Sequence, residues 1–306
     1  LAITSMGADN QNLYIDIIAK VINSAQANNQ QTLIVDFSYN GGGSVCLTNL
    51  VYSMLNPTTV MGTNLQYGSA YGYYDLRRSE SMDMVASSNT AQMGMYSPSK
   101  YRRIDNRQQY TNMSYYFEGT PRLRGHKYAN CTQRALFPGD CDGWARFNFP
   151  EIDINKPYST FQFKKIIFIT DGACGSACAT ILSQFQAHAA PGSISVVSYG
   201  GVNPNSDNVQ MDTSSFSGGN VVDWVSFAST FRLLPNPPAR FITTAGIRFT
   251  FNQYYMHEDD AIPREFFRLA GDYHVNQWLP LLSTSPYSPT QAVVDLYETA
   301  AQVGVY

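Results

Sequence analysis

Apolar residues along the chain alternate between continuous runs and helical spacing, which is the pattern of an α/β fold. The run at 32–37 is continuously apolar, as expected of a parallel strand that is covered on both faces, and 164–170 and 193–199 are predicted to be further strands. Residues 11–28 instead carry apolar side chains at helical spacing on two adjoining stripes. The other predicted elements are a short strand at 1–6, helices at 47–55, 176–189 and 290–301, and an aromatic strand at 246–255.

The succession of strands and helices is interrupted between residues 61 and 159. This stretch is rich in Tyr, Arg, Ser, Asn and Met and shows little periodicity. We therefore predict one core domain over residues 1–306, interrupted by an inserted subdomain at 61–159 that is tied by at least one disulfide.

The composition limits the classes of partner. Hydrophobic residues make up 44% of the 306 residues, which is enough for a full core, and charged residues make up only 14%, with a net charge of −3. A nucleic-acid partner held by bulk electrostatics is therefore not expected. No apolar run approaches the ~20 residues needed to cross a bilayer, so we predict no membrane span.

Two N-glycosylation sequons favour an oxidising secretory route. Asn112 and Asn130 each stand two residues before Ser or Thr. A glycan on either side chain requires export, and so do stable disulfides among the five cysteines. We predict that the protein is secreted or extracellular and that Asn112 and Asn130 are glycosylated.

The cysteine spacing suggests two short disulfide loops. Cys131 and Cys141 are ten residues apart, and Cys174 and Cys178 are four apart, so each pair can close a short loop. We predict both disulfides. Cys46 is then a buried thiol or the partner in some other pairing.

Two turns rich in small residues follow two of the predicted strands. The glycines at 41–43 leave backbone N–H groups uncovered, so this turn can point donors at an incoming oxygen. Ser176 stands where a buried strand becomes a helix, and a helix N-terminus favours developing negative charge. Each turn alone has an ordinary explanation, since tight turns need glycine and Ser176 could be an N-cap. Together in one core they predict an oxyanion hole and a nucleophile.

Several segments resemble those of the tail-specific, or C-terminal processing, serine peptidases. LIVDFSYNGGGSVCLTNLVYSMLNP is similar to their glycine-rich segment, and ITDGACGSACATILSQF to their nucleophile segment. SYGGVNPNSDNVQMDTSSFSGG and HEDDAIPREFFRLAGDYHV resemble later segments of the secreted eukaryotic branch, which is related to the tricorn core. The likeness spans most of the chain outside 61–159.

The resemblance implies a ClpP/crotonase-like α/β core of ββα units with a large irregular insertion. It also implies hydrolysis of peptide bonds in a peptide or protein substrate through an acyl-enzyme on Ser176. The oxyanion hole would be formed by the backbone N–H groups of Ala177 and of Gly42 or Gly43. No cofactor and no metal are expected.

The general base is left open by the sequence. No lysine follows Lys165, which excludes the serine–lysine dyad of the bacterial enzymes. The tricorn-like arrangement places a histidine before the glycine-rich segment. We therefore expect the base in an upstream part of a longer precursor, which stays bound as a separate, cleaved N-terminal segment or is lost on processing. His257 is the internal candidate, although its acidic neighbours equally fit a solvated turn.

Two other functions remain open. One is a catalytically silent secreted glycoprotein that uses the peptidase fold for binding or structure. The other is an α/β-hydrolase esterase, because Ser176, Asp212 or Asp223, and His257 or His274 occur in the required chain order. The esterase elbow needs small residues two positions before and after the serine, where this sequence has cysteines.

Overall fold

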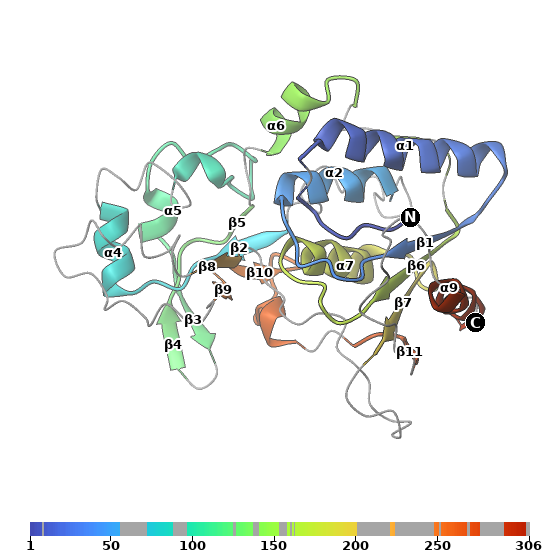
Figure 1. The fold of residues 1–306 in the computed structure, drawn as a ribbon. Coiled ribbons are helices and arrows are strands. Elements are labelled where there is room, and N and C mark those ends of the chain that lie inside the picture. Colours follow the sequence, from blue (N-terminus) through green and yellow to red (C-terminus); the bar gives the residue numbers. More distant parts are fainter. Residues whose placement is uncertain are drawn as a thin grey trace. The chain divides into compact units, whose positions relative to one another are not determined.

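A computed structural model gives the fold of the chain in two compact units (Figure 1). The first unit comprises Leu1–Gln66, Ala145–Phe216 and Arg268–Tyr306, and the second comprises Tyr67–Trp144 and Ser217–Phe267. The structure describes residues 1–7, 9–55, 72–87, 97–124, 127–136, 141–152, 158–159, 161, 163–200, 221–223, 248–250, 252–267, 270–275 and 291–303.

The first unit is built on a parallel sheet, so the predicted α/β fold is confirmed. Its strands lie in the order β1-β6-β7-β11, and every neighbouring pair is parallel. The strands are β1 (Thr32–Asp36), β6 (Lys165–Thr170), β7 (Ile194–Tyr199) and β11 (Tyr273–Val275). The pattern did not predict β11, a three-residue strand whose side chains are only partly buried.

Helices cover both faces of this sheet. Successive side chains of a strand point to opposite faces, so apolar residues of one strand pack against helices on both sides. Ile167 and Ile169 of β6 pack with Leu296 of α9. Phe168, between them, points to the opposite face, where its ring contacts Phe37 and Phe185. The helices are α1 (Gln11–Ala27), α2 (Val45–Leu55), α7 (Ala177–His188) and α9 (Gln291–Val303).

Helix α1 shows how the sequence fixes where a helix begins and which face it buries. Asn10 caps its first turn, since the side-chain Oδ1 accepts the N–H of Leu13 at 3.0 Å. Of the two apolar stripes, the one made by Ile15, Ile18, Ile22 and Ala25 is buried. Leu13 and Ile17 on the adjoining stripe are exposed, at 52% and 46%.

The first residues of the chain run beside β1. The structure has isolated parallel bridges between Ala2 and Asp36 and between Met6 and Gly43 in place of a continuous strand at 1–6. The bridges lie four residues apart because this segment pairs first with β1 and then with the turn that follows it.

The second unit is assembled from short strands. A three-stranded antiparallel sheet has the order β10-β2-β5, and two further pairs are β3–β4 and β8–β9. The strands are β2 (Tyr73–Asp75), β3 (Pro121–Arg124), β4 (Lys127–Asn130), β5 (Ala135–Leu136), β8 (Val221–Asp223), β9 (Arg248–Thr250) and β10 (Gln253–Tyr255). The helices are α4 (Glu80–Ser87), η3 (Pro98–Lys100), α5 (Ser114–Phe117), η4 (Arg264–Phe266) and α6 (Cys141–Asn148). Helix α6 begins in this unit.

The structure of this unit differs from the sequence prediction in two respects. The single aromatic strand at 246–255 is wrong, because β9 and β10 are separate strands that belong to different sheets. The unit also includes Ser217–Phe267, which the pattern did not connect with the stretch at 61–159. The boundaries 61 and 159 stay a prediction.

The core of the second unit is made of tyrosines around a buried carboxylate. Asp75 is fully buried, and its carboxylate contacts Arg122 at 3.1 Å, Arg134 at 3.5 Å and the hydroxyl of Tyr255 at 3.0 Å. The guanidinium of Arg134 also lies 3.6 Å from the centre of the Tyr255 ring. The buried charge is therefore paired, as burial of a carboxylate requires. The tyrosines packed nearby are Tyr74, Tyr101, Tyr110, Tyr115, Tyr116 and Tyr254.

Candidate functional site

Ser176 lies at the carboxyl edge of the sheet, which is the edge where β1, β6 and β7 end. It follows β6 and stands directly before α7, with φ 49° and ψ −120°. Such a conformation costs a residue with a side chain about 1–3 kcal/mol and persists only where the surroundings enforce it. A strained serine on a sharp strand-to-helix turn has the geometry of a nucleophile elbow, which exposes the hydroxyl.

The hydroxyl of Ser176 is not used to cap the helix. Although Ser176 occupies the N-cap position of α7, its side chain makes no capping hydrogen bond. Its carbonyl accepts the backbone N–H of Thr180 at 2.9 Å and the Thr180 hydroxyl at 3.1 Å. Within the described residues Oγ has no hydrogen-bond partner. The N-cap explanation is therefore not supported.

The glycine-rich turn after β1 approaches Ser176 closely. A Cβ on Gly42 would lie 2.7 Å from Ser176 Cβ, 2.7 Å from the Gly175 carbonyl oxygen and 3.0 Å from the Ala177 nitrogen. Gly42 also has φ +105°, which L side chains rarely adopt. The two turns predicted from the sequence are thus in contact, and only glycine fits at that contact.

Fewer backbone N–H donors are available at this contact than the sequence allowed. The N–H of Gly42 donates to Asn40 Oδ1 at 2.9 Å, so it is used inside the turn. The N–H groups of Gly43 and Ala177 have no acceptor among the described residues. Of the two glycines that the prediction allowed, Gly43 therefore retains an available donor.

The segment at 1–7 supports the glycine-rich turn from the other side. The N–H of Met6 donates to the Gly42 carbonyl at 2.9 Å, and the N–H of Ser44 donates to the Met6 carbonyl at 2.8 Å. A Cβ on Gly43 would come within 2.3 Å of the Met6 carbonyl carbon. Gly43 is therefore required by this backbone approach.

Asp171 and Asn40, which the sequence analysis missed, fasten the two turns to each other. Asp171 follows β6, and its carboxylate accepts the N–H of Tyr39 at 3.0 Å and the N–H of Ala173 at 3.0 Å. The carbonyl of Asn40 accepts the N–H of Gly175 at 3.0 Å. Asp171 directly follows β6, and Asn40 stands beside the glycines in the turn after β1, and these positions are the only sequence signal that either residue carried.

A disulfide brackets Ser176. Cys174 and Cys178 are bonded, as predicted, and both are fully buried. The bond closes a five-residue loop whose central residue is Ser176, so it restrains the strained turn directly.

The other predicted disulfide is wrong. Cys131 is a thiol whose Sγ lies 3.6 Å from the Ala129 carbonyl, while Cys46 and Cys141 are both disulfide-bonded. Short spacing in the sequence misled the prediction, because Cys131, directly after β4, is fully buried as a thiol, while Cys141, the first residue of α6, is bonded elsewhere.

His257 lies in the second unit, and Ser176 lies in the first. His257 is exposed and belongs to a turn closed by Asp260, whose carboxylate accepts the His257 N–H at 2.9 Å. This is the acidic turn that the sequence offered as an alternative. The assignment of His257 as a base stays a prediction.

The other histidines contribute to different parts of the fold. His274 of β11 has Nδ1 3.2 Å from the Ser198 hydroxyl on β7. His188 is the last residue of α7, at the opposite end of the helix from Ser176. His126 and Asp212 lie outside the described residues, and Asp223 is on β8 of the second unit.

A polar network occupies the carboxyl edge behind the glycine-rich turn. Asp36 accepts hydrogen bonds from the N–H of Ser38 at 2.8 Å and from the Tyr297 hydroxyl at 2.6 Å. The Tyr199 hydroxyl donates to Ser38 Oγ at 2.8 Å. Burial raises the pKa of Tyr199, and burial together with the hydrogen bond to Asp36 raises the pKa of Tyr297. Both phenols are therefore held in the neutral form.

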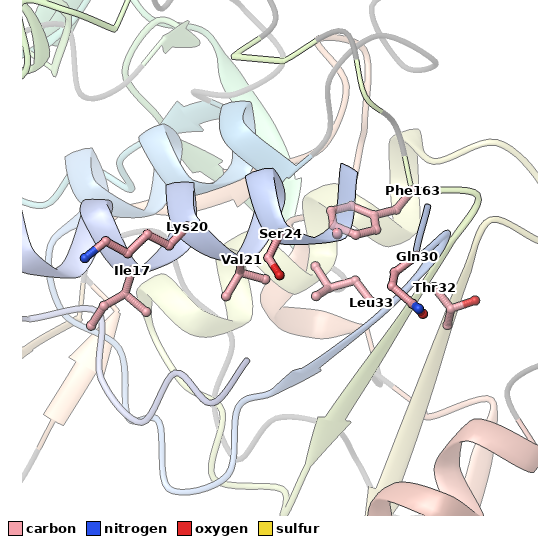
Figure 2. A pocket seen from close by; sticks show the side chains of 9 residues that line it. Ile17, Lys20, Val21, Ser24, Gln30, Thr32, Leu33 and Phe163 are labelled. Atoms are coloured by element: carbon pink, nitrogen blue, oxygen red, sulfur yellow. The ribbon is translucent and has the colours of Figure 1, made fainter. Parts of the chain in front are cut away.

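A pocket of about 460 Å³ lies at the other end of the sheet (Figure 2). Thr32 and Leu33, at the start of β1, line it together with Ile17 and Val21 of α1 and Phe163. Because β1 and β6 are parallel, this pocket is at the amino edge, whereas Ser176 follows the carboxyl edge. It is therefore separate from the candidate catalytic site.

Both sequon asparagines are exposed. Asn112 precedes α5, and its Oδ1 accepts the N–H of Ser114 at 2.9 Å, while Asn130 ends β4. Either side chain is accessible to a glycan in this fold. Across the described residues, three or more His, Cys, Asp or Glu side chains do not gather as a metal site, and no helix is long and apolar enough to span a membrane.

Comparison with known proteins gives structural neighbours only. The sequence matches no protein-family model and no curated protein. A protein of Parabacteroides merdae described as a candidate peptidase is 12% identical, with a TM-score of 0.42, and the match covers 100% of this chain and 60% of that one. A candidate S41 protease of Bacteroides fragilis is 14% identical, with a TM-score of 0.38, and is matched over 98% of this chain and 53% of its own.

Mature CPAF is a third neighbour. It is 12% identical, with a TM-score of 0.43, and the match covers 100% of this chain and 50% of CPAF. The chain thus spans between half and 60% of the length of these three proteins.

Proposed function

We propose that the protein is a serine peptidase in which Ser176 attacks the carbonyl carbon of a peptide bond. The observation that carries this proposal is the strained backbone of Ser176, at φ 49°, combined with a hydroxyl that is not used for capping. Backbone strain of this kind clusters at functional sites, and a strained strand-to-helix turn is one way to expose a nucleophilic serine.

The two available backbone donors would stabilise the oxyanion. As Ser176 Oγ bonds to the carbonyl carbon, negative charge moves to the carbonyl oxygen. The N–H groups of Gly43 and Ala177 can donate hydrogen bonds to this oxygen. Ala177 is the first residue of α7, so the helix dipole adds to its effect. Donors of this kind are each worth a few kcal/mol in the transition state. The amine then leaves with a proton, and water hydrolyses the acyl-enzyme.

A proposed general base completes the machinery. The hydroxyl of serine is a weak nucleophile unless a base lies within hydrogen-bond reach, ~2.6 to 3.2 Å. Ser176 Oγ has no such partner among the described residues. We propose a histidine from an upstream segment of a longer precursor, with His257 as the internal candidate.

The proposed setting is extracellular. Exposed sequons at Asn112 and Asn130 and the buried disulfide between Cys174 and Cys178 support export through an oxidising compartment. Treatment of the native protein with an N-glycosidase should lower its mass by the glycans on both asparagines. An unchanged mass would contradict the proposed route.

The function is tested by comparing two serines of the same segment. In the full-length protein, Ser176→Ala should abolish turnover of an unfolded peptide substrate and leave the midpoint of thermal unfolding unchanged. Ser183→Ala is the matched control, since Ser183 is buried in α7 and its Oγ makes no hydrogen bond in the described structure. Undiminished turnover by Ser176→Ala would reject the assignment.

A catalytically silent binding module is the second candidate. The lack of a base beside Ser176 within the described residues favours it. Comparing the 306 residues alone with the chain extended upstream separates the possibilities. Turnover only in the extended chain supports an upstream histidine, turnover by the isolated chain supports His257, and turnover in neither supports the silent module. Short esters assayed in parallel test the esterase alternative.

A further inference from the structure

Asn40 joins three segments that surround the candidate catalytic site. It is fully buried, and its Nδ2 donates to the Ile3 carbonyl at 2.8 Å while its Oδ1 accepts the N–H of Gly42 at 2.9 Å. Its own carbonyl accepts the N–H of Gly175, the residue before Ser176, at 3.0 Å. One side chain and its backbone therefore connect the segment at 1–7, the glycine-rich turn and the serine turn.

The hydrogen bond to Gly42 determines which donor the site can offer. Because Gly42 donates to Asn40, its N–H is directed into the turn. The next N–H, that of Gly43, has no acceptor among the described residues. Gly42 has φ +105° and Gly43 has φ +149°, so this turn depends on hydrogen bonds to fix its peptides. Asn40 holds the peptide before Gly42 through the Gly42 N–H, and the Met6 N–H holds the following peptide through the Gly42 carbonyl. Asn40 also holds the segment that carries Met6, through the Ile3 carbonyl.

The chemistry of this position requires one donor and one acceptor. An amide provides both, whereas an ionised carboxylate provides acceptors alone. A carboxylate here would face the Ile3 carbonyl without a hydrogen between them, and it would place negative charge beside the contact of Gly42 with Ser176.

We propose that Asn40 is the positioning residue of the oxyanion hole. It acts through Gly42 and Gly175, so that the N–H of Gly43 is aimed at the substrate carbonyl beside the N–H of Ala177. This inference rests on the proposed function of Ser176. It assigns no contact between Asn40 and substrate.

The test compares two buried asparagines in the full-length protein. Asn40→Asp should slow fluorophosphonate labelling of Ser176 by about 10²-fold at neutral pH, which is the effect of losing one oxyanion donor. Asn252→Asp is the matched control, because Asn252 is equally buried and its Oδ1 accepts the Tyr101 hydroxyl in the second unit. It should keep the parent rate per folded molecule.

A pH series gives a readout that loss of stability would not produce. Protonation of the new carboxyl restores a donor toward the Ile3 carbonyl, so the ratio of variant to parent rate should rise as pH falls. The charged groups of the adjoining turns, Asp36 and Asp171, are present in both proteins and cancel in this ratio. A pH-independent ratio, or equal rates, would overturn the role of Asn40.

A second measurement needs no variant. In the unaltered protein, the amide signals of Gly43 and Ala177 should shift when Ser176 reacts with the fluorophosphonate, while the Gly42 amide stays protected from hydrogen exchange. A Gly42 amide that exchanges freely, or that shifts as the adduct's donor, would overturn the proposal. A parent protein that is not labelled would instead reject the proposed function, and with it the role of Asn40.

Discussion

The two ends of the parallel sheet differ in how their turns are built. At the carboxyl edge, several residues have positive φ: Tyr39, Gly42, Gly43, Gly172, Ser176 and Gly200. At the amino edge, the positive-φ positions among the described residues are Asn29 and Gly192, each in a simple turn, and an apolar pocket lies between α1 and β1. One end stores backbone strain, and the other packs apolar side chains.

The carboxyl edge is therefore the part of the sheet whose turns are not built for stability alone. Strain at Ser176 is maintained by one disulfide, whose two cysteines stand on either side of it, and by hydrogen bonds from neighbouring backbone. Turns at the amino edge could be changed at the ordinary cost of a turn residue.

Gly42→Ala should have the largest effect. Its Cβ would meet the Ser176 Cβ and the Gly175 carbonyl at 2.7 Å, so the two turns must separate. We expect the rate of Ser176 labelling to fall by at least about 10²-fold, the loss of an oxyanion donor.

Two alanine variants serve as controls for that change. A Cβ on Gly41 has nothing within 4 Å, so Gly41→Ala should keep the parent rate. Gly192→Ala at the amino edge, with φ +77° and open space, should cost about 1 kcal/mol of stability and leave labelling unchanged. Equal loss of labelling in all three variants would remove the contrast between the two edges.

Removal of the disulfide should have an intermediate effect. Replacing both Cys174 and Cys178 by alanine releases the five-residue loop around Ser176. Chain entropy alone makes such a short loop worth about 2 kcal/mol of unfolding free energy. We expect that loss in chemical denaturation together with roughly tenfold slower labelling of Ser176. A stability loss with an unchanged labelling rate would show that the disulfide does not hold the strained turn.

Tyr199→Phe should have the smallest effect. It removes the hydrogen bond to Ser38, which costs about 1 kcal/mol near neutral pH. The folded-state pKa of Tyr199 is raised above the unfolded value of about 10, so the parent loses stability as pH rises through 10. The variant should lose stability less steeply there, which denaturation at pH 9 and pH 11 would measure. Parallel curves for the two proteins would contradict the assignment.

The sequence predicted β1, β6 and β7 of the first unit because these strands are mainly apolar, and it predicted the helices because apolar residues recur along them at helical spacing. The observed β6 at Lys165–Thr170 and α7 at Ala177–His188 lie within a residue of expectation. The second unit offered no such pattern. Its core is built from tyrosines and a buried Asp75, whose pairing with Arg122 and Arg134 depends on contacts remote in the chain.

The sequence predicted which residues form the candidate site, but not the hydrogen bonds that join them. Ser176 and the glycines were visible because two turns rich in small residues follow two strands of the same core. The hydrogen bonds of Asn40 and Asp171 were not visible, since they join residues up to 135 and 132 positions apart. Cys131 was mispaired for the same reason, because spacing in sequence is not distance in space.

The central claim is that Ser176 is a reactive nucleophile. The most direct measurement is to treat the full-length protein with a fluorophosphonate and to map the modified residue by mass spectrometry. We predict one adduct, on the peptide that contains Ser176, and none when the protein is denatured beforehand. A protein that remains unmodified at Ser176 when folded, or that carries the adduct on another serine, would contradict it.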